Sequence, residues 1–466
     1  MKLRTAPLRV VSSQQLCRNA LRTPPLALCR TRFRQFSETC RLAQQTDGQL
    51  RFPGALEAKF TTNLAFENPK DKEVIPCYRV MDSEGVIVDK SYKPDFSNEE
   101  ALELYTNMIK TSLIDLICLD AQRQGRISFY INNSGEEGIA VGSASALDPG
   151  DVAFPQYREL GLFIQRGFTF EDTMSQLFAN RRDPGRGRNM PVHYGSRALN
   201  IHTVSSVLAT QLPHAAGAAY ALKMKHLTNP TAHPPQVVIA YFGEGAASEG
   251  DTHAALNIAA TRACPVLFIC RNNGYAISTP TLEQYRGDGV ASRGAGYGIR
   301  TIRVDGNDIL AVREVTRRAR ELSLGLDSTD GDSAMKPVLI EAMSYRVSHH
   351  STSDDSFAYR NRVEVEDWKR RDNPITRFRR YLEREGLWDE EREKELRTNL
   401  RKDLLKAFSA AEKEKKPPLR SMFEDIYADL TPDLRAQMEE LRDLIQRYPA
   451  EYDVSEFEGG LDSLKQ

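Results

Sequence analysis

The hydrophobic positions of the chain fall into short apolar blocks separated by segments with helical periodicity. Four blocks have the length and composition of buried strands: 237–242, 265–270, 301–304 and 338–342. Two helix-length segments lie between them: 248–263 and 309–324. This alternation predicts an α/β fold with a largely parallel sheet and helices on both faces. In such a sheet, ligands bind at the carboxyl ends of the strands.

Other local patterns predict a hairpin and two further helices. Residues 78–88 read as strand, turn and strand around Asp82-Ser83-Glu84-Gly85. Ser97 and Glu100 form a capping box ahead of apolar residues at helical spacing, which predicts a helix over about 98–124. A segment rich in small residues predicts a helix over 203–226 that packs closely against another backbone.

The two ends of the chain differ in composition from its centre. Residues 364–416 are dense in Arg, Lys and Glu, and Thr431-Pro432 has the pattern that begins a helix. We therefore expect four parts: a segment at 1–45, an irregular extension at 46–96, the α/β domain at 97–361, and a helical C-terminal region at 362–466. We expect the last region to pack on the domain and on partner subunits.

Residues 1–45 are rich in arginine and contain one acid, Glu38. An Arg-rich, acid-poor start without an apolar core predicts a mitochondrial transit peptide rather than a secretory signal. Arg34-Gln35-Phe36-Ser37 resembles a matrix-protease site. The alternative is a basic arm that contacts nucleic acid or a membrane. Removing the segment takes the net charge from −1 to about −9.

Composition excludes several classes of function. No apolar run in the 466 residues approaches the roughly 18–20 residues of a membrane span. The near-neutral charge argues against a general nucleic-acid binder. The seven cysteines form no Cys-x-x-Cys pair, so neither a zinc nor a disulfide framework is expected. Scattered thiols suit the reducing mitochondrial matrix, and we expect Cys264 and Cys270 to lie in the core.

Two polar motifs each follow a predicted buried strand. Gly243-Glu244-Gly245 follows one strand, and Asn273 and Tyr275 follow the next. The Glu244 carboxylate, the Asn273 side-chain carbonyl and the Tyr275 main-chain carbonyl are oxygen ligands that suit magnesium. The glycines allow close approach of the backbone, and a helix starting near Ser248 directs its positive end toward the same place. Together these features predict a magnesium–diphosphate cradle.

The two motifs together resemble the thiamin diphosphate signature, Gly-Asp/Glu-Gly followed some thirty residues later by Asn-Asn. Five further segments resemble the α subunits of branched-chain 2-oxo acid dehydrogenase decarboxylase components: 154–159, 190–195, 205–211, 286–289 and 349–355. The resemblance runs from about Phe52 to the C-terminus. Pyruvate dehydrogenase α subunits read His-Ser-Met-Ser-Asp where this chain has His350-Ser351-Thr352-Ser353-Asp354.

The resemblance implies a thiamin diphosphate-binding fold and an α2β2 heterotetramer with a β subunit. It implies oxidative decarboxylation of branched-chain 2-oxo acids and transfer of the acyl group to the lipoyl group of a partner acyltransferase. The glutamate that activates thiamin comes from the β chain in this family, so we expect this chain to be inactive alone. Glu136 and Glu137 are expected in a structural Gly-rich loop.

The resemblance also assigns site residues. Glu244, Asn273 and the Tyr275 carbonyl would hold magnesium. The residues that would contact thiamin diphosphate are Gln156, Tyr157, Arg158, Ser206, Leu208, Gly245, Ala246, Arg271 and His350. Arg158 and Arg271 could supply bidentate donors to the diphosphate, or could form structural ion pairs. His350 is the expected catalytic residue for acyl transfer to lipoamide; its alternative role is only to bind diphosphate.

Two further sites follow from the resemblance. Ser205, Thr210, Gln211 and the carbonyl of Val207 match a structural potassium site, although the family usually has Pro where this chain has Val207. Ser351 matches an inhibitory site for a regulatory kinase, opposed by a phosphatase. The position of a second family phosphoserine is Asn361 here, which leaves single-site regulation.

Two rival functions stay open on the sequence. One is a sister α subunit of pyruvate or acetoin dehydrogenase. The other is a non-catalytic assembly protein that retains the cradle for stability, against which the intact Glu244/Asn273 pair argues.

Overall fold

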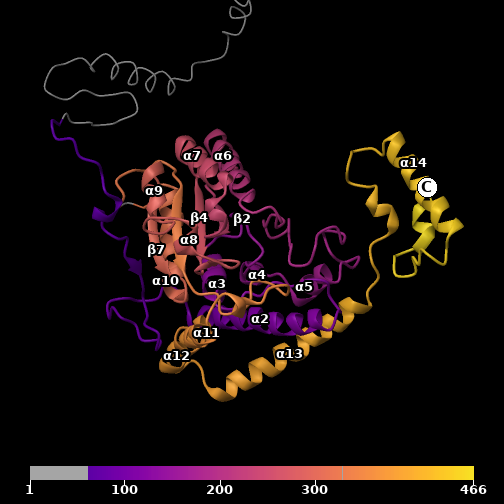
Figure 1. Ribbon diagram of the computed structural model, residues 1–466, viewed down its shortest axis with the longest axis horizontal. Helices are drawn as coiled ribbons and strands as arrows, with labels where there is room; N and C mark the ends of the chain where they lie inside the picture. The colour runs from indigo at the N-terminus through magenta and orange to yellow at the C-terminus, as the bar shows by residue number, and fades with distance from the viewer. Residues whose placement is uncertain (1–60, 328, 466) are drawn as a thin grey trace, which may run out of the picture. The chain divides into compact units, whose positions relative to one another are not determined.

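The computed structural model describes residues 61–327 and 329–465 (Figure 1). The chain divides into two compact units, Met1–Lys72 and Glu73–Gln466. The described part of the first unit contains one short 3₁₀ helix, η1 (Pro69–Asp71). The predicted transit peptide at 1–45 lies outside the described residues.

A six-stranded parallel sheet forms the centre of the second unit, with the strand order β1-β7-β8-β4-β3-β2. The strands in chain order are β1 (Cys77–Tyr78), β2 (Val152–Phe154), β3 (Val238–Gly243), β4 (Val266–Asn272), β7 (Arg300–Asp305) and β8 (Val338–Met343). The four predicted apolar blocks are β3, β4, β7 and β8, and the prediction of a largely parallel sheet is confirmed. A small antiparallel pair follows β4: β5 (Tyr275–Ala276) and β6 (Thr279–Pro280).

The two edge strands are short and were not predicted as strands of this sheet. β1 lies inside the segment at 46–96 and pairs with β7. The predicted hairpin after it is a tight turn that one antiparallel bridge closes, between Met81 and Ile87. β2 has three residues and pairs with β3. Strands this short carry no periodic signal, because two or three residues cannot establish an alternation.

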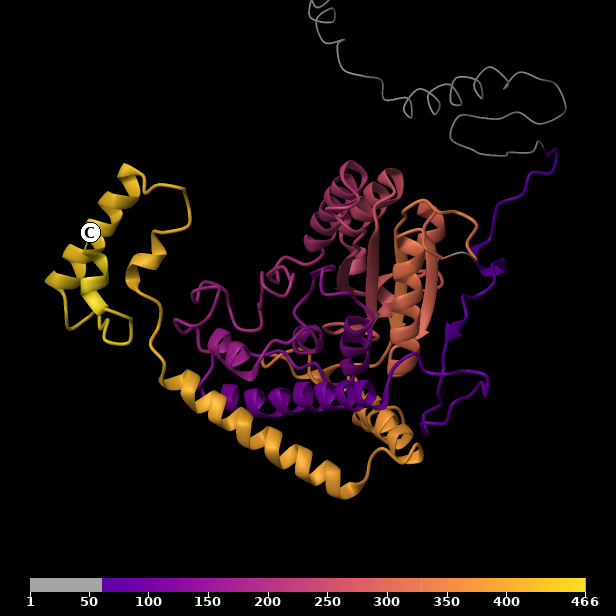
Figure 2. The same ribbon diagram turned by 180° about the vertical axis from the view of Figure 1, so that it is seen from behind.

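Helices cover both faces of the sheet (Figures 1 and 2). Several helices share one core with the sheet, among them α2 (Asn98–Arg123), α3 (Glu137–Ser145), α4 (Leu160–Gln165), α5 (Phe170–Leu177) and α10 (Ile309–Ser323). The opposite face packs against α6 (Gln211–Thr228) and α7 (Gly250–Arg262). Successive residues of β3 alternate between the two cores: Ile239 and Tyr241 belong to one, Ala240 and Phe242 to the other. A strand buried on both faces therefore reads as a continuous apolar run.

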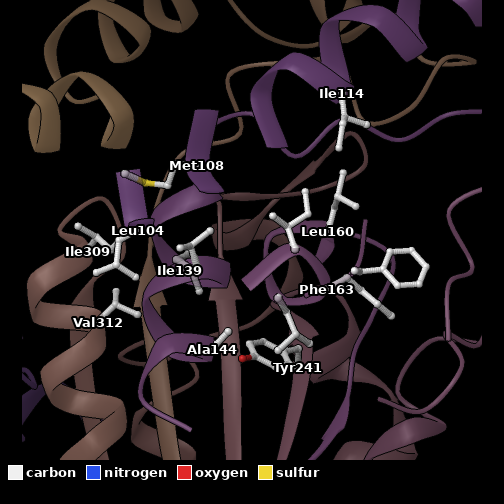
Figure 3. Close-up of a cluster of buried hydrophobic side chains, with 14 of the residues drawn as sticks. Leu104, Met108, Ile114, Ile139, Ala144, Leu160, Phe163, Tyr241, Ile309 and Val312 are labelled. Atoms are coloured by element: carbon white, nitrogen blue, oxygen red, sulfur yellow. The ribbon is translucent and has the colours of Figure 1, made fainter. Parts of the chain in front are cut away.

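The core beneath α2 joins residues from several helices and from β3 (Figure 3). Leu104 and Met108 of α2 meet Ile139 of α3, while Ile309 and Val312 come from α10. The predicted helix at 98–124 is confirmed, and the Ser97/Glu100 capping box is formed on both sides. Cys264 and Cys270 are buried as expected.

Glu136 and Glu137 were expected in a structural Gly-rich loop, but Glu137 is the first residue of the helix α3 and Glu136 directly precedes it. Gly138 and Gly142 lie one turn apart on the same face. A Cβ atom on Gly142 would lie 3.0 Å from the Ile309 carbonyl oxygen, and one on Gly138 would lie 2.9 Å from that of Gly306. These glycines therefore let α3 pack directly on the backbone at the start of α10, which offsets their low helix propensity.

The helix predicted over 203–226 begins only at Gln211. The preceding residues form a loop in which Ala209 has a positive φ of 66°. The Ser205 hydroxyl accepts a hydrogen bond from the Val207 amide at 3.3 Å. Local bonds of this kind compete with helical backbone bonds, so the first third of the prediction is wrong.

The C-terminal region is helical, as predicted. Its helices are α11 (Arg362–Arg371), α12 (Pro374–Arg384), α13 (Glu390–Lys413) and α14 (Pro432–Arg447). α13 lies alongside α2 (Figures 1 and 2). Thr431 caps α14. A small separate core surrounds Phe423 and Met438. Shorter helices elsewhere are η2 (Ala246–Ser248), α8 (Thr281–Gln284), α9 (Ser292–Tyr297), η3 (Ser356–Ala358), η4 (Leu419–Met422) and η5 (Gly460–Leu464). Within the described ranges, no helix has the length and hydrophobicity of a membrane span.

Candidate active site

A cavity of about 490 Å³ opens at the carboxyl ends of β3 and β4. Six segments line it: residues 129–131 before α3, the residues after β2, the loop before α6, the segments after β3 and β4, and the loop after β8. Twelve predicted site residues lie in its wall: Gln156, Tyr157, Arg158, Ser206, Leu208, Glu244, Gly245, Ala246, Arg271, Asn273, Tyr275 and His350. Ser205, Val207, Thr210, Gln211 and Ser351 do not line this cavity.

Glu244 is the carboxylate of the predicted metal site. Its side chain is almost fully buried at the end of β3, and its Oε1 atom has no hydrogen-bond partner. Its other oxygen, Oε2, accepts a long hydrogen bond of 3.5 Å from the backbone amide of Asn273. Burial raises the pKa of Glu244 to about 7. A buried carboxylate oxygen without a donor is costly, and a bound cation would stabilise its ionised form.

Asn273 faces Glu244 from the turn after β4. Its Nδ2 donates to Glu136 Oε1 at 2.8 Å, and its Oδ1 accepts from the Tyr275 amide at 3.2 Å. The Tyr275 carbonyl oxygen accepts from Arg346 Nη1 at 3.2 Å. A carbonyl has two lone pairs, so one acceptor position of Tyr275 stays open.

Arg271 is a buried cation in the cavity wall. Its guanidinium forms ion pairs with Glu136 and Glu159, both fully buried carboxylates. Burial opposes the charged form of Glu136, but Arg271 and Arg158 outweigh it and lower the pKa of this carboxyl. Arg271 therefore forms the structural ion pairs that were one of its two expected roles. Because its guanidinium also lies in the cavity wall, a bound anion could contact it as well.

Glu159 and Gln156 connect this ion pair to the strands. The second oxygen of Glu159 accepts from the Gln156 amide at 2.6 Å. The Gln156 side-chain oxygen accepts from the Gly243 amide at 2.8 Å. Buried networks of hydrogen bonds and ion pairs hold a site in one geometry.

Arg158 links the segment after β2 to the loop after β8. It donates to the main-chain oxygens of Asn132 and His350, the latter at 2.6 Å. The His350 ring lies against Tyr157, with Nε2 and the Tyr157 hydroxyl 3.2 Å apart. Burial, together with Arg158 and Arg346, lowers the pKa of His350 to about 3, so its imidazole is neutral at physiological pH.

Asp354 orders the loop that carries His350 and Ser351. Its carboxylate accepts from the His350 amide at 2.7 Å and from the Tyr359 hydroxyl at 2.8 Å. The Ser351 hydroxyl is partly exposed and accepts from the Ser353 amide at 3.4 Å. The candidate phosphorylation site thus lies one residue from the cavity wall and within the same turn as Asp354.

The predicted potassium ligands lie in the loop before α6 and in its first turn. Gln211 donates through Nε2 to the Tyr241 carbonyl at 2.8 Å, which leaves its side-chain oxygen as an acceptor. Val207 is 68% exposed, so its side chain makes little contribution to the position of its carbonyl.

Sequence reasoning did not select four residues of the site. His193 bonds Ser206 Oγ through Nε2 at 2.8 Å. Glu136 and Glu159 hold Arg271, and Arg346 holds the Tyr275 carbonyl. His193 lies in a segment that carried the resemblance, which was the available signal. Glu159 also lies in such a segment, 154–159, whereas Glu136 and Arg346 depend on contacts between distant segments, which no local pattern reveals.

The residues that line the cavity are suited to bind a cation together with an anionic ligand. Glu244 and Asn273 offer oxygen atoms of the kind magnesium prefers. Arg158, Arg271 and the backbone amides near Gly245 line the same cavity and are groups that bind an anion. A Cβ atom on Gly245 would lie 2.8 Å from Ala276 Cβ, so the turn requires glycine here. The residues present therefore fit a magnesium-bound diphosphate.

Comparison with known proteins agrees with this arrangement. The family model for the dehydrogenase E1 component matches residues 105–420, and the chain belongs to that family. Its six-stranded sheet and surrounding helices are the thiamin diphosphate-binding α/β fold.

Three similar relatives carry the name "2-oxoisovalerate dehydrogenase subunit alpha, mitochondrial". The protein from Caenorhabditis elegans is 48% identical, with 87% of this chain and 91% of the relative aligned. The Mus musculus protein is 50% identical over 88% of this chain and 90% of its own length. The Homo sapiens protein is 50% identical over 88% and 89%.

Proposed function

We propose that this chain is the α subunit of a mitochondrial, thiamin diphosphate-dependent decarboxylase component that acts on branched-chain 2-oxo acids. The component decarboxylates the acid oxidatively and transfers the acyl group to the lipoyl group of a partner acyltransferase. The observation that carries the proposal is the unpartnered Glu244 oxygen beside Asn273, in a cavity whose wall also holds two buried arginines. The names of relatives near 50% identity support the substrate class.

Magnesium would be held by Glu244, Asn273 and the Tyr275 carbonyl, and thiamin diphosphate by the nine wall residues predicted for it. The bound cofactor supplies an electron sink for decarboxylation. The protein supplies position and charge. Arg158 and Arg271 balance the diphosphate, and the glycine turn brings backbone amides toward it.

His350 is the proposed catalytic residue for acyl transfer. Its neutral imidazole has Nε2 beside the Tyr157 hydroxyl, so it can accept or donate a proton at that atom. The Asp354 and Arg158 bonds to its main chain fix the ring in the cavity wall.

The remaining assignments belong to the same proposal. Potassium would lie among Ser205, Thr210, Gln211 and the Val207 carbonyl, and would stabilise the loop that carries Ser206 and Leu208.

The chain would work in an α2β2 heterotetramer, with the β subunit supplying the activating glutamate. Ser351 would be the target of a kinase and a phosphatase. The parts would be a transit peptide at 1–45, an extension at 46–96, the α/β domain at 97–361 and the helical region at 362–466.

A substrate panel on the complex reconstituted with its β subunit tests the proposal. Thiamin-dependent release of carbon dioxide from 3-methyl-2-oxobutanoate should exceed that from pyruvate in kcat/KM. A preference for pyruvate or acetoin would overturn the substrate class. Robust activity of this chain alone would overturn the two-chain site.

A further inference from the structure

Glu136 is a buried carboxylate that touches two proposed cofactor-binding residues at once. One of its oxygens accepts from Asn273 Nδ2 at 2.8 Å, and the other pairs with the Arg271 guanidinium. It is 1% exposed and lies directly before α3. It also lies 4.0 Å from the Arg158 Nε atom. Glu136 has no place in the sequence motifs that define the metal site.

These contacts determine which end of the Asn273 side-chain amide, the oxygen or the NH₂ group, faces the proposed cation. A carboxylate accepts hydrogen bonds only, so it holds the NH₂ end of the amide on its own side. The Tyr275 amide is a donor and holds the oxygen end on the other side, at 3.2 Å. If the amide turned over, a carbonyl would face the Glu136 carboxylate and an NH₂ group would face the Tyr275 N–H.

We infer that Glu136 is a positioning residue for the metal site: it orients the Asn273 amide so that its oxygen faces magnesium, and it couples that orientation to Arg271. This inference rests on the magnesium–thiamin diphosphate site proposed above. Outer partners that orient metal ligands affect metal affinity strongly, because a ligand that presents the wrong atom no longer binds the ion.

The Glu136→Gln variant separates orientation from burial. A glutamine can present its oxygen to only one of the two donors. The Arg271 guanidinium is the stronger donor, so the NH₂ group of the introduced glutamine will face Asn273 and favour the inverted amide. We expect the apparent Kd for Mn²⁺, used in place of Mg²⁺, to rise about 10- to 100-fold. The measurement is a titration of the metal-free α/β complex at fixed thiamin diphosphate, followed by electron paramagnetic resonance.

A second substitution should reverse this loss. In Glu136→Gln/Asn273→Asp, the glutamine donates to one aspartate oxygen, the other aspartate oxygen faces the cation, and the glutamine oxygen accepts from Arg271. The pair carries the same net charge as the original. We expect the double variant to bind Mn²⁺ within about threefold of the wild type, whereas Asn273→Asp alone sets two carboxylates against each other and binds weakly.

Glu137→Gln is the matched control, because Glu137 is similarly buried but bonds the Gly135 amide rather than Asn273 or Arg271. Its Mn²⁺ affinity should match that of the wild type. The inference is overturned if Glu136→Gln binds as tightly as wild type, if the double variant is as weak as the single one, or if Glu137→Gln loses as much affinity. A wild-type complex that binds no Mn²⁺ with thiamin diphosphate would instead overturn the proposed function.

Discussion

Arg158 donates a hydrogen bond of 2.6 Å to the main-chain oxygen of His350, 192 residues further along the chain. The same guanidinium bonds the Asn132 carbonyl. Three segments that approach the cavity separately are therefore held by one buried cation. The loop that carries His350 and Ser351 depends on this contact and on Asp354 for its conformation.

Removing the guanidinium should loosen that loop. In Arg158→Met, the carbonyls of Asn132 and His350 lose their donor, and the diphosphate loses a positive partner. We expect amide hydrogen exchange across 346–356 to accelerate at least about tenfold and thiamin diphosphate affinity to fall by about the same factor. Arg370→Met, at an exposed arginine of α11, is the control and should change neither. Normal exchange in Arg158→Met would contradict the role of Arg158 in ordering the loop.

Metal affinity should depend on pH through Glu244. The free site has a pKa of about 7 at this carboxyl because burial disfavours its ionised form. Below that pH the cation must displace a proton, so the apparent Kd for Mg²⁺ should rise about tenfold for each unit of pH decrease. Calorimetric titration of the metal-free complex between about pH 5.5 and 8.5 tests this dependence. An affinity that stays constant over the range would show that Glu244 is not a ligand.

A negative charge at Ser351 should release the loop. A phosphate there would lie in the same turn as Asp354, and the repulsion would compete with the bonds that Asp354 makes to His350 and Tyr359. We expect Ser351→Asp to increase proteolysis between 346 and 360 and to weaken thiamin diphosphate binding. Ser351→Ala, which adds no charge, is the control. Equal protease resistance in Ser351→Asp and the wild type would argue against this mechanism of inhibition.

Glu137 should make stability depend on pH. Burial raises its pKa to about 8 from a usual value near 4.5. Between these values the folded chain keeps a proton that the unfolded chain has lost, so the free energy of unfolding decreases as pH rises. This stabilisation is complete below about pH 4.5 and is lost as pH rises through 8.

Glu137→Gln has no such proton to lose. Relative to the wild type, its free energy of unfolding should increase by about 1.4 kcal/mol for each pH unit between about 5 and 7.5. Urea unfolding of the complex at a series of pH values is the measurement. A constant difference between the two proteins would show that Glu137 is ionised in the folded state.

The long elements of the fold could be predicted because each carries its own signal. β3 and β4 are continuous apolar runs, and α2 has a capping box and a helical stripe. α3 was missed because its glycines are favourable only next to the start of α10, which is a tertiary contact. The loop before α6 was missed because the Ser205 side chain bonds the backbone there.

The site residues that could be predicted are those that directly follow a strand or belong to a sequence motif. The cavity brings together Glu244 and Asn273 because β3 and β4 are neighbours in register. The partners that hold these residues were not predictable. Glu136 is joined to Asn273 over a separation of 137 residues, and a buried carboxylate in a glycine-rich segment gives no local sign of its partner.

Tyr157 and His350 meet across a separation of 193 residues, and the ends of β3 and β4 line the same cavity. A fragment that ends before β8 lacks the loop that carries His350, and its binding surface is therefore incomplete. Cofactor binding should therefore distinguish chains that include the folded loop after β8 from shorter chains, which lack part of the cavity wall.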